Sequence, residues 1–108
     1  MKMIDISAKL TNEKPALKLA EDKVYFIDDR KNTVLKLMKK MESANLNDPS
    51  FIDEILEITL GKKAVKEINE MDLSFSAYQT IMMAVIAGIT GESLEAVEER
   101  FRETPTGQ

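Results

Sequence analysis

The chain has 108 residues, with 15 basic and 19 acidic side chains and a formal net charge of −4. It contains no cysteine and no histidine, which excludes disulfides and thiolate chemistry and removes the commonest general base and metal ligand. The acidic balance argues against nucleic acid as the main partner, and the length suits one domain with one hydrophobic core.

The N-terminal part of the sequence predicts a β-hairpin followed by a basic helix. Residues 4–10 indicate an extended start, and residues 16–20 and 24–28 are two short runs whose partial alternation suits paired strands. A helix is then predicted over residues 28–43, beginning at one of the two aspartates. Its predicted apolar stripe is Val34, Leu37, Met38 and Met41.

Two further helices are predicted in the middle of the chain. Asp48 is a favourable N-cap and Pro49 suits the first helical position, so a second helix is expected to begin there. Gly61 is typical of a helix C-cap or a bend. Residues 62–71 then predict a third, short helix.

The most unusual segment is the uncharged stretch Leu73–Gly91, which is flanked by Asp72 and Glu92. It predicts a fourth helix that begins at Ser74 or Ser76. Its polar residues and acidic flanks argue against a transmembrane span. We therefore expect a helix buried at the middle of a bundle in a soluble, cytosolic protein, with no contact to a membrane.

A fifth helix is predicted after Ser93, ending at Thr104-Pro105. The expected fold is mainly α, a small helical bundle of about five helices with a short N-terminal β-hairpin. Residues 1–103 would form this single helical domain, and residues 104–108 a C-terminal tail. Residues 1–47 carry a net charge of +3 and residues 48–108 a net charge of −7, an asymmetry that either orients copies or partners or only solvates two faces.

The sequence predicts no catalytic, cofactor-binding or metal site. An acidic cluster in and before the fifth helix lacks the loop that an EF-hand needs, so a solvated helix face is the simpler explanation. The basic helix has no interleaved aromatics of the kind that nucleic-acid grooves use. A superficial helix-turn-helix over residues 83–101 would set glutamates against phosphates. The acidic cluster in and before the fifth helix consists of Glu92, Glu95, Glu98 and Glu99.

A partner-binding face is predicted on the fourth and fifth helices. The second face of the fourth helix is small or soft and uncharged, and methionine adapts its shape to apolar helices. Core filling would equally explain the methionines. Met83 is the central candidate for binding. The predicted partner-binding residues are Thr80, Met83, Ala84 and Ala87, followed by Leu94, Val97 and Phe101.

The order of these features resembles a known family. A hairpin and small acidic helices are followed by Leu60-Gly61, a short linking helix, D-L-S-F-x-x-Y at 72–78 and T-G-E-S-L-E-x-V-E-E-R-F at 90–101. From about residue 16 onward, and most specifically over Asp72–Phe101, the chain is similar to the tail assembly chaperones of long-tailed siphoviruses and Gram-positive prophages.

This resemblance implies a helical protein without enzymatic activity that works in the cytoplasm of the bacterial host. Such chaperones coat the long tape measure protein, keep it soluble until tail tube subunits polymerise around it, and are absent from the mature virion. A ribosomal frameshift often produces a longer form that recruits the tail tube protein, and this chain suits the short form. Self-association along the filament is a further expectation.

Two other classes remain open from the residues. One is a small acidic regulator or adaptor that binds a host protein or DNA. The other is a minor virion structural protein such as a head–tail connector component. A gene position beside a very long open reading frame favours the chaperone, whereas presence in purified particles favours the structural protein.

Overall fold

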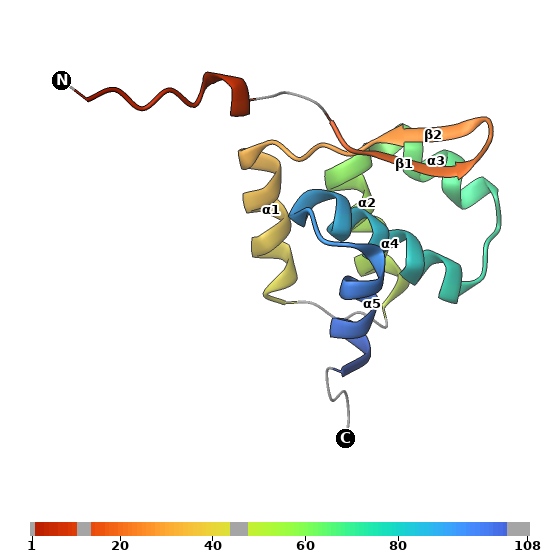
Figure 1. Ribbon diagram of the computed structural model, residues 1–108. Helices are drawn as coiled ribbons and strands as arrows, with labels where there is room; N and C mark the ends of the chain where they lie inside the picture. Colours follow the sequence, from red (N-terminus) through yellow and green to blue (C-terminus); the bar gives the residue numbers. More distant parts are fainter. Residues whose placement is uncertain (1, 11–13, 44–47, 104–108) are drawn as a thin grey trace.

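The computed structural model describes residues 2–10, 14–43 and 48–103 of the chain, in which five helices follow an N-terminal hairpin (Figure 1). This confirms the predicted mainly α bundle with a hairpin at its start. The elements are η1 (Ser7–Lys9), β1 (Ala16–Ala20), β2 (Lys23–Phe26), α1 (Lys31–Met41), α2 (Pro49–Leu60), α3 (Lys62–Glu70), α4 (Phe75–Thr90) and α5 (Leu94–Glu103).

Helix α2 lies at the centre and contacts α1, α3 and α4. Its start follows the predicted capping, because the Asp48 side chain accepts a hydrogen bond from the Ser50 amide at 2.9 Å and proline occupies the first turn. Ile55 and Leu56 are completely buried. Gly61 has a φ of 95°, which a residue with a side chain rarely adopts, and it turns the chain into α3.

The hairpin packs against α4 through its inner face. Leu17 pairs with Tyr25 in an antiparallel register, and Leu17 and Ile27 are buried. The Tyr25 hydroxyl donates a hydrogen bond to Glu67 on α3 at 2.9 Å. Gly88 lets the two elements approach closely, because a Cβ at that position would lie 2.8 Å from the Ile27 Cδ1 atom.

The first helix begins two or three residues later than predicted, at Lys31. The Asp28 carboxylate accepts hydrogen bonds from the Arg30 amide and guanidinium and from the Thr33 hydroxyl, at 2.8 to 3.1 Å. The Asp28 backbone amide donates a hydrogen bond to the Thr59 carbonyl at 2.8 Å. Asp28 therefore fixes a turn that joins the hairpin, α1 and the end of α2.

The N-terminal residues also differ from the extended start that was expected. Residues 7–9 form a 3₁₀ turn, and Asp5 stabilises it by accepting hydrogen bonds from the Ser7 amide at 3.0 Å and the Ser7 hydroxyl at 2.7 Å. All of residues 2–10 are exposed, and Figure 1 shows this segment reaching away from the bundle.

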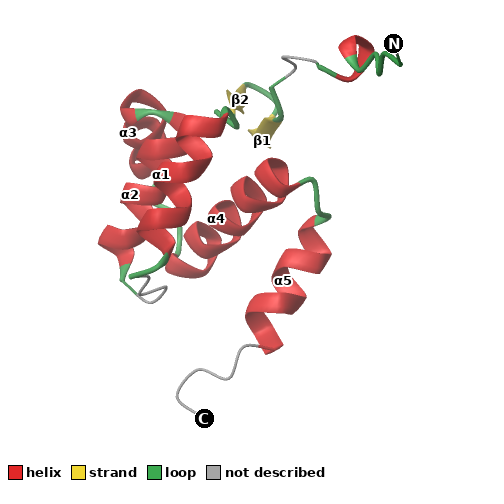
Figure 2. Cartoon of the chain, turned by 90° about the vertical axis from the view of Figure 1, so that its left-hand side faces the viewer, coloured by secondary structure: helices red, strands yellow, loops and turns green. Residues whose placement is uncertain are grey.

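Helix α4 begins after Ser74, whose hydroxyl accepts a hydrogen bond from the Ala77 amide at 3.1 Å, and ends at Gly91 with a φ of 79°. The chain then bends by 119° into α5, so that the two helices form an open V (Figure 2). Within the described ranges no single helix is long and apolar enough to span a membrane, although α4 and α5 together meet the length and composition. The predicted tail, residues 104–108, lies outside the described residues.

Candidate partner-binding surface

The four residues predicted on the second face of α4 divide between surface and core. Thr80 is exposed, and its hydroxyl donates to the Ser76 carbonyl at 3.2 Å. Met83 and Ala84 are partly buried and pack against the edge of the core. Ala87 is only 7% exposed. The face available to a partner is therefore centred on Thr80, Met83 and Ala84.

The residues predicted on α5 divide in the same way. Leu94 is partly exposed, and Phe101 is partly exposed while it packs against the core. Val97 has no exposed surface. In this arrangement Ala87 and Val97 belong to the buried core, and α5 contacts α4.

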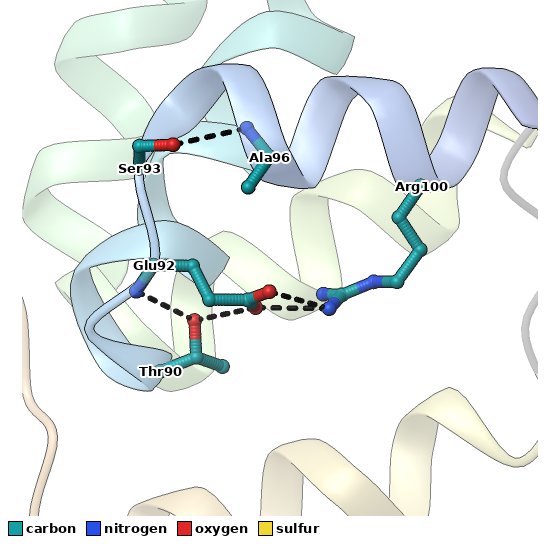
Figure 3. Close-up of polar contacts among 5 residues, drawn as sticks. All are labelled: Thr90, Glu92, Ser93, Ala96 and Arg100. Atoms are coloured by element: carbon teal, nitrogen blue, oxygen red, sulfur yellow. Dashed lines mark hydrogen bonds and ion pairs between the residues drawn. The ribbon is translucent and has the colours of Figure 1, made fainter.

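Polar contacts fix the corner between α4 and α5 (Figure 3). The Thr90 hydroxyl donates to Glu92 at 2.9 Å, and the Arg100 guanidinium donates to both Glu92 oxygens at 2.9 and 2.8 Å. The Ser93 hydroxyl accepts from the Ala96 amide at 3.1 Å and caps α5. The bonds from Thr90 and Arg100 hold the pKa of Glu92 below its ordinary value. The apolar side chains of both helices are thus presented at a defined angle.

The corner also explains part of the predicted acidic cluster. Glu92 serves as the hydrogen-bond acceptor of the turn, whereas Glu95 and Glu99 are exposed on α5. In the part of the chain that the structure describes, no group of three or more acidic side chains is placed to hold a metal ion.

Further exposed apolar side chains lie on elements that the sequence did not single out for binding. Met38 was predicted on the same apolar stripe as Leu37 but is 60% exposed, whereas Leu37 is buried together with Thr33 on this helix, which contacts α2. Val24 and Phe26 are exposed on the outward face of strand β2. The alternation of side chains along this strand is the sequence signal that could have identified this face. The N-terminal segment adds Met3, Ile4, Ile6 and Leu10.

A pocket of about 250 Å³ lies where α2 begins, α3 ends and α4 begins. Ile52, Phe75 and Tyr78 provide apolar walls, and Asp53 and Asp72 provide carboxylates. Asp53 lies near the start of α2 and Asp72 lies between α3 and α4. Their proximity depends on how α2 and α4 pack, so local pattern alone did not reveal this pocket.

Neither a protein-family model, nor a curated protein, nor a solved structure matches this chain. The resemblance to tail assembly chaperones therefore stays a prediction from the motifs at Asp72–Phe101. The arrangement itself is suited to binding: apolar side chains lie at the surface of α4 and α5, next to a core that keeps both helices in place.

Proposed function

We propose that this protein is a phage tail assembly chaperone that binds the tape measure protein in the host cytoplasm and keeps it soluble until the tail tube forms. The observation that carries the proposal is that α4 and α5, which contact each other, leave apolar side chains only partly buried, namely Met83, Ala84, Leu94 and Phe101. The motif resemblance over residues 72–101 supports the identity of the partner.

The binding mode we propose is a helix laid into an apolar groove. A tape measure protein offers long amphipathic helices, which aggregate when their apolar faces meet. Met83 can adapt to different side chains along such a helix, so that many copies bind one long partner at unlike sites. The charge difference between residues 1–47 and 48–108 would favour head-to-tail stacking of these copies.

Co-expression tests the proposal. The tape measure protein encoded by the neighbouring very long reading frame should become more soluble with this chain than without it. Met83→Asp should reduce that effect, because a carboxylate would enter the apolar surface. Met38→Asp is the matched control, since it makes the same substitution on the exposed side of α1.

Circular dichroism decides how the variants are interpreted. Helix content near that of the parent chain means that Met83→Asp acts on binding, and lost helix content means that Met83 belongs to the core. If the tape measure protein is no more soluble with the parent chain than without it, the proposed function is wrong.

A further inference from the structure

The pocket at the start of α4 combines apolar walls with negative charge. Ile52 is almost fully buried at its base, and Phe75 is 40% exposed at its edge. Asp53 and Asp72 are charged lining residues, and among the residues that the structure describes no lysine or arginine lines the pocket. The walls suit a hydrocarbon chain, and the two carboxylates suit a cation at its end.

The two aspartates are positioned in different ways. The Asn69 side-chain amide donates a hydrogen bond to Asp53. The Asn69 side-chain oxygen accepts a hydrogen bond from the Tyr78 hydroxyl, and this hydroxyl also donates to the Ile68 carbonyl at 3.1 Å. Asp72 follows α3 with a φ of 53°, a left-handed conformation that directs the chain into α4. The bond from Asn69 thus orients the Asp53 carboxylate, whereas at Asp72 the backbone turn between α3 and α4 sets the position of the residue.

Neither carboxylate has a basic partner within the described part of the chain. Burial, followed by the nearby Glu57 carboxylate, raises the pKa of Asp53 above its ordinary value. A cation in the pocket would offset that cost, and the rings of Phe75 and Tyr78 would add a favourable contact with it.

We propose that this pocket binds the side chain of a lysine or arginine that projects from an apolar helix of the partner. That the cation comes from a partner helix rests on the proposed function. Phe75 and Met83 lie about two turns apart on α4, so one helix running along α4 would reach both the pocket and the apolar corner.

A small probe tests the pocket without the tape measure protein. We expect n-hexylammonium, added to the ¹⁵N-labelled full chain, to shift the amide signals of residues 53 and 72–78. It should saturate them at about a tenfold lower concentration than 1-hexanol, because only the ammonium can form charge-assisted hydrogen bonds with the aspartates.

The variant that tests the charge is Asp53→Asn combined with Asp72→Asn. Asparagine keeps the shape, accepts the bond from Asn69 and tolerates the left-handed conformation at position 72. The double variant should bind both probes about equally. The matched control, Glu42→Gln with Glu95→Gln, removes two exposed charges elsewhere and should keep the tenfold preference.

Equal binding of both probes to the parent chain, or a preference that survives in the double asparagine variant, would overturn the pocket proposal. Should the double variant lose helix content, Phe75→Ala replaces it and must weaken both probes while the preference for the cation remains. The proposed function is tested separately, by the solubility of the tape measure protein on co-expression.

Discussion

Helices α2 and α4 are the two most apolar helices of the molecule, yet they use their apolar residues differently. Helix α2 is covered by α1, α3 and α4, and its apolar face is buried in the core. Helix α4 is covered by α2, α5 and the hairpin strand β1, and part of its second face remains at the surface. Apolar content alone therefore does not define a binding face. What matters is which neighbours cover each side.

Two adjacent methionines on α4 give the sharpest form of this comparison. Met82 is 2% exposed, whereas Met83 is partly exposed. Met82→Ala should cost about 2–5 kcal/mol of unfolding free energy through lost burial and the cavity it leaves. Met83→Ala should cost about 1 kcal/mol or less, because its neighbours and solvent can fill the space. Urea unfolding followed by circular dichroism measures both, and equal costs would place Met83 in the core.

The close approach of the hairpin to α4 gives the next largest effect. Gly88→Ala sets a Cβ 2.8 Å from the Ile27 Cδ1 atom, and Ile27 is almost fully buried. Overpacking should lower the free energy of unfolding by about 1–3 kcal/mol, and the better helix propensity of alanine should restore about 1 kcal/mol. The expected net loss of stability is about 1 kcal/mol. Ile27→Val removes the clashing methyl group, so the double variant should be more stable than the two single losses predict. Additive losses in this double-mutant cycle would show that the contact is not the cause.

The turn at Asp28 should give a smaller effect that depends on pH. Hydrogen bonds from the Arg30 side chain, followed by the Thr33 hydroxyl and the Arg30 amide, hold the pKa of Asp28 well below its usual range. The pKa of Asp28 is lower in the folded than in the unfolded state. Its contribution to the free energy of unfolding is therefore complete above about pH 4 and is lost as the pH falls further. Asp28→Asn should therefore be less stable than the parent chain at pH 7, and the difference should shrink toward pH 2. A difference independent of pH would contradict this account.

The corner of α4 and α5 should give the smallest effect on stability. Arg100→Gln removes the ion pair between the exposed Arg100 and the partly exposed Glu92, and ion pairs near the surface contribute little to folding. The thermal midpoint should barely change. Partner binding should nevertheless weaken, because the angle of α5 is held less firmly. A large drop in the thermal midpoint would show that the corner is part of the stabilising core, as α2 is.

Local signals in the sequence predicted much of the fold. Asp48 with Pro49, Ser74 and Ser93 mark helix starts, and Gly91 marks a helix end, because capping is decided by the residues themselves. The core assignment of Ala87 and Val97, and the exposure of Met38, were not predictable in this way. They depend on where the hairpin, α5 and α2 pack, which involves residues far apart in the chain.

The candidate site shows the same division. Met83 was predicted on the second face of the apolar fourth helix, and Leu94 and Phe101 from their helical spacing on the fifth, and all three lie at or near the surface. The pocket with Asp53 and Asp72 was missed, because these residues are nineteen positions apart and only the packing of α2 against α4 brings them together. Charge patterns within one helix cannot reveal such a pair.

The proposed binding of the tape measure protein to α4 and α5 can be measured by affinity capture. Tagged parent chain and Met83→Asp would each be recovered from phage-infected or prophage-induced cells, with mass spectrometry of what accompanies them. We expect one very large, coiled-coil-rich phage protein to accompany the parent chain and to be strongly reduced with the variant. Recovery of DNA or a host regulator in its place, or equal recovery of the large protein with both chains, would contradict it.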